Sequence, residues 1–405
     1  MAMQIIPQPN NDPDIIRSLA DSELDELSRE IYEIYRQAAE EVQKKADDYF
    51  SWFQATDENM KQKYIDGEIT LKEYQNWRKS HMLTGKRWYE LASVLAMDMT
   101  NADLIAGSVI NGHLPAVYAI GYNYSLYQAE KQTMFTISDT LYNRRAVERM
   151  IRNNTANIKV TRVDRGIAWE WNQGHVQSAA MQGILQGEDM HQIARRIARN
   201  TDINQRAAMR NARTAVTSAE NGGRFEAFQD VESAGFKVRK TWLATLDFRT
   251  RYSHRQLDRV TVEGADTEFE NGCRYPGDPR CEDGAELYNC RCSVVNQVVP
   301  MDLSVKPGRN GKLGSMPYEE WKNAKGNETE FRKAKNEEKD RQQHEKYKDL
   351  NVEGVPAKFS DFQEVKYHSP GEWKKVKSDA LSKQAQKRKK EKEEKAAKEA
   401  AENGK

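Results

Sequence analysis

The hydrophobic periodicity of the chain changes once, near residue 236, and this change sets the fold class. Before it, apolar residues recur at steps of three and four along a stripe from Leu24 to about Phe53, the spacing of an amphipathic helix. After it, the pattern takes the two-residue period of a strand over Phe236, Val238, Lys240, Trp242 and Ala244. We therefore expect a mainly α protein with a small, irregular α+β domain near its C-terminal part.

Two helical blocks precede the change. An extended arm over residues 1–21, which contains three prolines, leads into an N-terminal helical domain over residues 22–135. Thr70 and Glu73 have the spacing of a capping box, which predicts a second long helix from there to about Leu95. A helical middle domain follows over residues 136–235. These blocks predict long helices, mostly antiparallel.

Glycines and caps divide the middle domain. Gly187 predicts a break, Asp202 and Gln205 predict a helix start, Gly222 and Gly223 predict a loosened or terminated helix, and Gly235 predicts the end of the next one. Small residues share one face of the helix after residue 205, which favours close helix packing: Ala207, Ala208, Ala212, Ala215 and Ala219.

Residues 236–299 predict the α+β domain. Short strands are expected at Val260–Val262 and in CRCSVVNQVV, and the tract NGCRYPGDPRCEDG has the composition of an irregular loop. A unit of this size has difficulty burying enough apolar surface by itself. Docking on the helices or a bound metal would therefore stabilise it.

Residues 300–405 predict a charged extension that is helical or disordered. PYEEWKNAKG predicts a short helix, and the last 35 residues carry 12 basic and 7 acidic side chains, a net charge of +5. This tail fits a solvated helix, non-specific contact with DNA through counterion release, or a segment that docks on a protein. The whole chain has a net charge of only +1, so its overall charge does not demand a polyanionic partner.

The sequence gives no sign of a membrane or export function. No run of 18 apolar residues occurs, and the first residues lack the basic flank and apolar stretch of a secretion signal. We expect no membrane partner and an intracellular protein.

All four cysteines lie between Cys273 and Cys292, and in a reducing cytosol such a cluster suggests metal ligands. One structural zinc could be held by Cys273, Cys281, Cys290 and Cys292, or by the last two with His254 and one further ligand. Free buried thiols and a disulfide such as Cys273–Cys281 remain as alternatives. No other cofactor is indicated.

The densest group of polar residues is WLATLDFRTRYSHRQLD. If residues 250–258 are helical, Arg251, His254 and Asp258 share one face, and a histidine beside a carboxylate can act as an acid–base pair or as an oriented metal ligand. In the other interpretation, these residues with Asp247 and Arg249 hold an irregular backbone in place. No nucleophile elbow, phosphate loop or HExxH motif accompanies them. A metal-dependent hydrolase or nuclease using His254, Asp247 and Asp258 is the enzyme alternative.

The segments TWLATLDFRTRYSHRQLD, YPGDP and AELYNCRCSVV resemble the C-terminal signature of the Mu F-like phage head morphogenesis (minor capsid) proteins, and the similarity extends over residues 115–298. One departure is Arg259, since the family usually has glycine after the Leu-Asp pair. Another is Cys273 and Cys281, where many members have other residues. The signature positions are Trp242, Asp247, Arg249, Thr250, Arg251, His254, Asp258, Pro276, Gly277, Asp278, Pro279, Asn289, Cys290, Arg291 and Cys292.

The resemblance implies a low-copy virion component near the portal vertex, made in the host cytoplasm, that acts in procapsid assembly and in packaging or ejection of the genome. It implies the portal protein and the major capsid or scaffolding protein as partners, and no enzymatic activity. Some members are fused to toxin domains, but nothing after Val299 is long or apolar enough to predict a catalytic fold. Tryptophans are candidate interface anchors or, alternatively, core residues: Trp52, Trp77, Trp88, Trp169 and Trp171.

Overall fold

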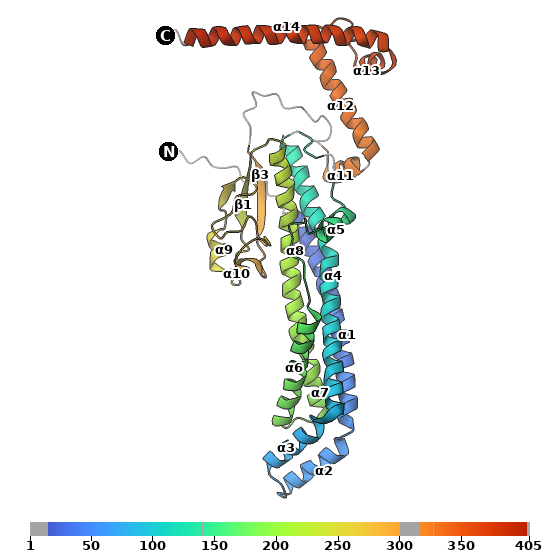
Figure 1. The fold of residues 1–405 in the computed structure, drawn as a ribbon, viewed down its shortest axis with the longest axis vertical. Coiled ribbons are helices and arrows are strands. Elements are labelled where there is room, and N and C mark those ends of the chain that lie inside the picture. Colours follow the sequence, from blue (N-terminus) through green and yellow to red (C-terminus); the bar gives the residue numbers. More distant parts are fainter. Residues whose placement is uncertain (1–14, 134, 139–140, 300–315, 327, 403–405) are drawn as a thin grey trace. The chain divides into compact units, whose positions relative to one another are not determined.

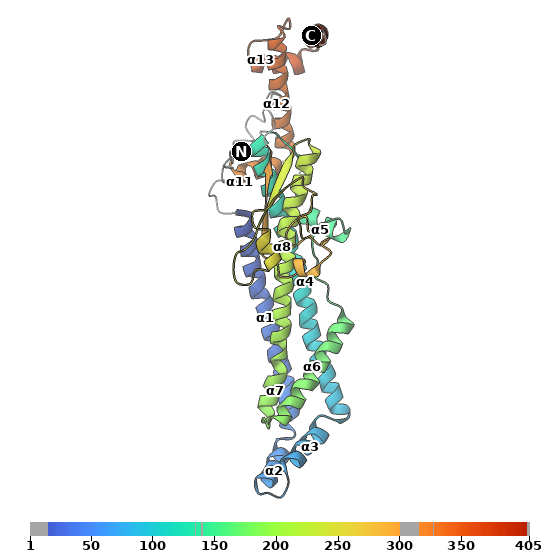
Figure 2. The same ribbon diagram turned by 90° about the vertical axis from the view of Figure 1, so that its left-hand side faces the viewer.

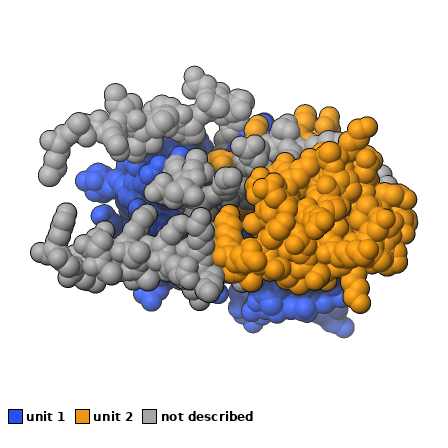
Figure 3. Space-filling model, turned by 90° about the horizontal axis from the view of Figure 1, so that it is seen from above, with its two compact units in different colours: residues 1–129, 142–301 blue, residues 130–141, 302–405 orange. Residues whose placement is uncertain are grey.

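The computed structural model describes residues 15–133, 135–138, 141–299, 316–326 and 328–402. The chain divides into two compact units, unit 1 with residues 1–129 and 142–301 and unit 2 with residues 130–141 and 302–405 (Figure 3). The described residues are mainly helical, with one small sheet, so the predicted fold class is confirmed. The predicted domain boundary at residue 235 lies inside unit 1.

Long helices build most of unit 1, and three of them run side by side (Figures 1 and 2). The helices of this unit are α1 (Ile15–Ser51), α2 (Gln54–Ile65), α3 (Leu71–Met82), α4 (Gly85–Thr133), whose residues 130–133 belong to unit 2, α5 (Arg144–Arg152), α6 (Arg165–Leu185), α7 (Met190–Ala198) and α8 (Asn200–Ser233). Helices α1, α4 and α8 share one hydrophobic core, whose members include Leu27, Ile31, Ala106, Ile110, Ala212 and Ala215. The helical segments predicted as two domains are therefore joined by common packing.

A second core lies where the end of α1 meets α3, α6, α7 and the start of α4. It contains Phe50, Met82, Trp88, Val176 and Ile193. The predicted capping box is present: the Thr70 hydroxyl accepts from the Glu73 backbone N–H, and the Glu73 carboxylate accepts from the Thr70 N–H at 2.8 Å. Residues 15–21 belong to α1 and not to an extended arm, whereas residues 1–14 lie outside the described residues.

Two predicted helix boundaries differ from the structure. The helix expected from Thr70 to Leu95 is divided into α3 and α4, because Gly85 has a φ of +83° and reverses the chain between them. Helix α8 begins at Asn200, before the predicted cap at Asp202, because Arg199 keeps helical angles after α7 and no new cap is needed. Gly187 and Gly235, both with positive φ, do follow helix ends as predicted.

Gly222 and Gly223 do not end α8, which continues to Ser233. A Cβ on Gly223 would lie 2.3 Å from the carbonyl oxygen of Tyr118, and one on Gly121 would lie 2.4 Å from that of Glu220. The absence of these side chains lets α4 and α8 cross in backbone contact. Close packing of the two helices therefore outweighs the low helix propensity of glycine.

Within the described part of the chain, α4 alone contains a window long and apolar enough to cross a membrane. A buried helix in the core of a soluble protein meets the same criterion. Ile110, Leu114 and Val117 of α4 are fully buried in the core shared with α1 and α8. We therefore assign α4 as a core helix of unit 1.

A three-stranded antiparallel sheet packs against α8 and forms, with its loops, the α+β region of residues 236–299 (Figure 1). Its strands lie in the order β2-β1-β3, with β1 at Val238–Leu243, β2 at Thr261–Glu263 and β3 at Ser293–Val298. Two short helices, α9 (Tyr252–Gln256) and α10 (Gly284–Leu287), interrupt the loops. In the central strand, Lys240 pairs with Val262 and with Asn296. The three strands confirm the predicted ones.

Unit 2 contains α11 (Tyr318–Gly326), α12 (Glu328–Asp349), α13 (Phe359–His368) and α14 (Pro370–Glu402). The buried carboxylate of Glu130 accepts from Trp321 Nε1 at 2.8 Å and from Lys325 Nζ at 2.6 Å, which holds α11 in place. A small core joins α12, α13 and α14, with Tyr347, Val352, Phe362, Val376 and Ala380. The charged extension is thus helical over most of its described length.

Candidate functional site

One face of α8 holds the backbone around the last two cysteines. The Thr217 hydroxyl donates to the carbonyl oxygen of Cys290 at 2.9 Å, and the Asn221 side-chain N–H donates to that of Cys292 at 3.2 Å. The Asn221 side-chain oxygen accepts from the Val294 N–H at 3.0 Å. Thr217 and Asn221 lie one turn apart and are buried. Neither residue was predicted as functional, because the pattern of this helix marks only its alanine face.

The loop that contains YPGDP approaches α8 on the same side. Gly277 has a φ of +82°, and a Cβ there would lie 2.9 Å from the Ser218 backbone nitrogen. Asp278 accepts two hydrogen bonds from the Arg274 guanidinium, at 2.7 and 2.8 Å, and both side chains are buried. Burial alone would raise the pKa of Asp278, but the hydrogen bonds from Arg274 lower it overall. The loop is therefore held by a buried ion pair.

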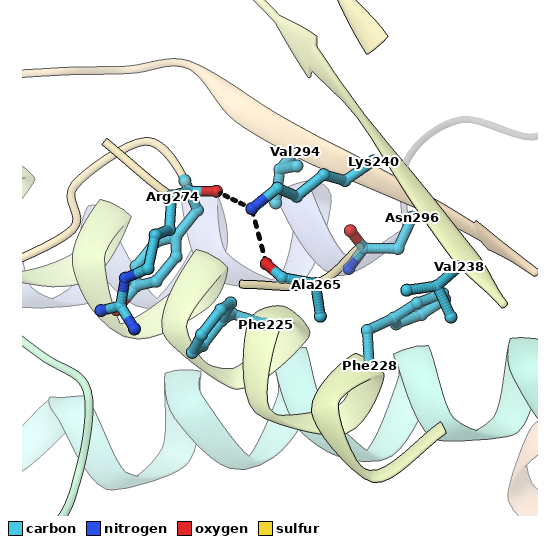
Figure 4. A pocket seen from close by; sticks show the side chains of 9 residues that line it. Phe225, Phe228, Val238, Lys240, Ala265, Arg274, Val294 and Asn296 are labelled. Atoms are coloured by element: carbon cyan, nitrogen blue, oxygen red, sulfur yellow. Dashed lines mark hydrogen bonds between the residues drawn. The ribbon is translucent and has the colours of Figure 1, made fainter. Parts of the chain in front are cut away.

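A small hollow lies between this loop and the sheet (Figure 4). The Lys240 ammonium group donates to the carbonyl oxygens of Ala265 and Arg274, both at 2.6 Å. Burial lowers the pKa of Lys240 to about 8. The hollow is lined by Phe225 and Phe228 and leaves no space for a water molecule, so it is a packing defect and not a ligand pocket.

The cysteines form two separate pairs. Cys273 and Cys281 are joined by a disulfide with a Cα–Cα distance of 4.8 Å, so the predicted four-cysteine zinc site is wrong in this structure. The physical reason is the fold of the loop, whose turns bring these two thiols together, away from the other pair. Cys290 and Cys292 are free and buried.

His254 lies between the free cysteines and a carboxylate. Its Nδ1 is 3.6 Å from Cys290 Sγ and 3.4 Å from Cys292 Sγ. On the other side of the ring, Nε2 is 2.9 Å from a carboxylate oxygen of Glu286. Short helix α9 positions His254, and the turn before β3 positions the cysteines. Of the second predicted ligand set, His254, Cys290 and Cys292 therefore lie together in the structure.

The two thiols have opposite acidities. Hydrogen bonds from the Cys290 thiol and from His254 together lower the pKa of Cys292 to about 4, against the effect of burial. The pKa of Cys290 is raised well above its usual value, first by its hydrogen bond to Cys292 and then by burial.

Glu286 was not predicted as a site residue. It accepts from Ser253 Oγ at 2.8 Å and from Asn271 Nδ2 at 3.0 Å. Burial raises the pKa of Glu286, but these hydrogen bonds lower it overall, so the side chain is a carboxylate. No spacing marks it in the sequence, because it lies 32 residues from His254 and meets it only through the fold.

The remaining signature residues mainly hold the loop between β1 and α9. Asp247 accepts from Arg291 Nη2 at 2.7 Å, and hydrogen bonds from Arg291 and the Arg249 N–H hold its pKa below the usual range. Asp258 accepts from the Ala244 N–H at 3.0 Å. Among the other positions, Trp242 and Pro276 are buried and Pro279 is half-buried. The Thr250 hydroxyl donates a hydrogen bond to Asp247, and the Arg251 guanidinium donates one to the backbone oxygen of Tyr288.

Two non-glycine residues of this region have positive φ. Arg259 has a φ of +63°, so the chain makes a left-handed turn here although the glycine usual in the family is replaced. Asn289 has a φ of +56°, a conformation that asparagine tolerates better than most residues. The side-chain oxygen of Asn289 and Nε1 of Trp242 are buried and have no hydrogen-bond partner among the described residues.

The predicted face of Arg251, His254 and Asp258 is not formed, because α9 ends at Gln256. Asp247 pairs with Arg291, Asp258 pairs with backbone, and His254 is only 1% exposed. The three residues of the enzyme alternative therefore lie in separate networks and do not converge on a common cleft.

Residues 174–295 match the family model described as "Phage Mu protein F like protein". This interval contains α8 from its first residue, the Cys/His cluster and all of the signature positions. This part of the chain is similar to the Mu F-like family. The order of motifs that suggested the resemblance is therefore confirmed.

Two curated proteins are similar to this chain. The minor head protein GP7 of Bacillus phage SPP1 is 26% identical over 227 residues, which cover 54% of this chain and 72% of that protein. A protein of Enterococcus faecalis named NAD(+)–arginine ADP-ribosyltransferase EFV is 25% identical over 281 residues, covering 66% of this chain but only 57% of that protein. No solved structure matches the chain.

Proposed function

We propose that this protein is a low-copy component of the phage head that associates with the portal protein and acts in procapsid assembly. The family and the similarity to a minor head protein support this role. The fold supports it as well, because the α+β region is fastened to a long helical bundle by α8 and its polar groups hydrogen-bond to its own backbone. Such a module is suited to rigid attachment and not to turnover.

The end of unit 1 formed by α2 and α3 supplies a candidate contact surface. Trp52 is 72% exposed and Ile65 is 62% exposed, and Leu71 and Leu185 are also exposed at this end. Exposed tryptophans are frequent anchors of protein interfaces. Of the other predicted anchors, Trp171 is exposed, Trp88 is buried in a core, and Trp77 and Trp169 are half-buried. We propose that Trp52 contributes to the portal contact.

Co-expression with the portal protein of the same phage tests the association. We expect the full chain to co-purify with the portal protein, and Trp52→Ala to weaken the complex at least tenfold. Phe248→Ala is the matched control, because Phe248 is 85% exposed but lies on the α+β region, and its complex should be unchanged. Failure of the wild-type chain to co-purify would overturn the association, and equal losses in both variants would overturn the assigned surface.

Presence in the virion is tested separately. Quantitative mass spectrometry of purified particles should find this chain at a small fraction of the major capsid protein. A scaffolding or major capsid protein as a further partner would appear as a cross-link in procapsids. Particles that contain no copy of the chain would contradict a head component.

We also propose that the chain acts without catalysis, since the residues of the hydrolase alternative do not share a cleft. The name of the Enterococcus faecalis relative does not transfer an activity, because this chain spans little more than half of that protein. Purified chain should release no nicotinamide from NAD and should cleave no DNA with or without divalent metal. Either activity, lost in a His254→Ala variant, would revive the enzyme alternative.

The charged C-terminal helix is proposed to contact packaged DNA without sequence preference. The net charge of +5 over the last 35 residues supports binding through counterion release. Removing residues 370–405 should lower DNA affinity and its salt dependence, while portal binding persists. An affinity that does not change between low and moderate salt would contradict this contact.

A further inference from the structure

We propose that His254, Cys290 and Cys292 bind one zinc ion. One ligand atom from each residue lies within 4.8 Å of the others, and all three residues are buried. Two thiolates and an imidazole form a soft donor set that favours zinc over magnesium or calcium. The inference rests on this cluster and does not depend on the proposed role in the head.

The spacing of the three donor atoms fits a tetrahedral ion. With Zn–N near 2.0–2.1 Å, Zn–S near 2.3 Å and tetrahedral angles, a nitrogen and a sulfur on the same zinc are about 3.5 Å apart. The distances from His254 Nδ1 to the sulfurs of Cys290 and Cys292 are 3.6 and 3.4 Å. The side chains therefore need little movement to bind the ion.

The surroundings orient the histidine as a ligand. Metal-binding histidines commonly direct their second ring nitrogen at a carboxylate, which sets the tautomer and the direction of the ring. Glu286 lies 2.9 Å from His254 Nε2 and is itself fixed by Ser253 and Asn271. This arrangement leaves Nδ1 facing the two sulfurs.

A polar molecule can complete the coordination. Within the described ranges, no fourth histidine, cysteine or acidic residue joins the cluster, so water is the fourth ligand that we propose. Trp242, whose ring is 5.3 Å from that of His254, and Asn289, next to Cys290, each bury a polar atom without a partner. Such groups are rare in folded proteins, and they favour an additional polar occupant in this region.

The zinc would be structural. It would connect α9 to the turn before β3, two segments that are otherwise joined through loops in a region with a small core. The disulfide between Cys273 and Cys281 would brace the intervening loop independently. Burial of the cluster excludes substrate access, in agreement with a non-catalytic role.

Metal analysis of the full-length chain, purified from zinc-supplemented cells, is the test. We expect one zinc per chain, and after exchange with cobalt a visible spectrum of a tetrahedral site with thiolate charge-transfer bands. Cys290→Ser and Cys292→Ser should each lose the metal. The Cys273→Ser/Cys281→Ser double variant is the matched control and should keep one zinc per chain.

Glu286→Gln gives a second measurement that does not depend on removing a ligand. It should keep one zinc per chain but weaken zinc affinity by about 10- to 100-fold in competition with a chelator. Wild-type chain without zinc and without a cobalt spectrum would overturn the proposal. So would zinc that survives in both single cysteine variants, or zinc that is lost from the double variant, because the ligands would then be other than the three named.

Discussion

Replacing Asp278 by asparagine would remove the carboxylate that neutralises Arg274 inside the α+β region. The carboxylate accepts from Arg274 Nε at 2.7 Å and from Nη2 at 2.8 Å, and also from the backbone N–H of Arg280 at 2.9 Å. The asparagine side chain has the same shape and can still accept from Arg280. Its amide group, however, would replace the oxygen that accepts from Arg274 Nε and from the Arg274 backbone N–H, so that donors would face donors there.

The expected loss follows from these contacts. Each charge-assisted hydrogen bond contributes about 1.5–3 kcal/mol, and breaking a buried ion pair by removing one partner typically costs about 3–5 kcal/mol. Arg274 is buried against the ring of Phe225 at 4.5 Å, so its charge would have no route to water. We expect Asp278→Asn to destabilise the region by about 3–5 kcal/mol.

Hydrogen exchange measured by mass spectrometry reports this loss locally. The N–H groups of Phe269 and Cys281 are hydrogen-bonded within the loop, and their exchange should accelerate by about two to four powers of ten. Asp266→Asn is the control, because Asp266 also contacts Arg274, at 3.3 Å, but its side chain is 69% exposed. Asp266→Asn should lower the free energy of unfolding by less than about 1 kcal/mol. Similar exchange rates in both variants would refute the reasoning.

The pH dependence provides an independent check. The pKa of Asp278 is lower in the folded protein than in the unfolded chain. Its contribution to the free energy of unfolding is therefore complete above pH of about 4, the pKa of the unfolded chain, and disappears as the pH falls through the pKa of the folded protein. The protection factors of the wild-type loop, which are the exchange rates corrected for the slower intrinsic exchange at low pH, should therefore fall on acidification below pH of about 4. The Asp278→Asn variant should show a smaller change over the same range.

Three further variants test other features of unit 1. Gly223→Ala should lower the free energy of unfolding by about 1–3 kcal/mol, because the new Cβ would collide with α4. Gly112→Ala is the control, because Gly112 faces open space on α4, and it should raise the free energy of unfolding by about 0.5–1 kcal/mol. Equal effects of the two variants in urea denaturation would contradict the close crossing of α4 and α8. Arg259→Gly should stabilise by about 1 kcal/mol by relieving the positive φ, and a lower unfolding midpoint would argue against strain there. Burial lowers the pKa of Lys240 to about 8, so between pH of about 8 and 10.5 the unfolded chain binds the lysine proton more tightly than the folded protein does. The free energy of unfolding should therefore rise with pH over this range, by up to about 3 kcal/mol. Lys240→Met should remove the rise, and a rise that persists in the variant would refute the assignment to Lys240.

The local sequence predicted the elements that depend on local physics. The Thr70–Glu73 capping box, the helix ends before Gly187 and Gly235, and the alternating strand around Lys240 all follow from contacts within a few residues. The continuation of α8 through Gly223 was not predictable in this way. It depends on the backbone of α4, which lies about a hundred residues earlier in the sequence.

The candidate site was predictable in part. The resemblance drew attention to His254, Cys290 and Cys292, but the spacing of the cysteines could not choose between the two ligand sets. That choice depends on the path of the loop, which brings Cys273 to Cys281 instead. Glu286 could not be predicted as a partner of His254, because no pattern in its polar surroundings indicates which side chain it contacts in the fold.

Helix α8 contacts the bundle on one side and the α+β region on the other through specific residues of a single unbroken run. A residue inserted into this run would rotate everything after it by about 100° and shift it by 1.5 Å. The alanines could then keep their places against α1 and α4, or Thr217 and Asn221 could keep theirs against the cysteine turn, but not both. Changes of length during evolution should consequently be confined to the connecting loops, and α8 should keep a constant number of residues between its two sets of contacts.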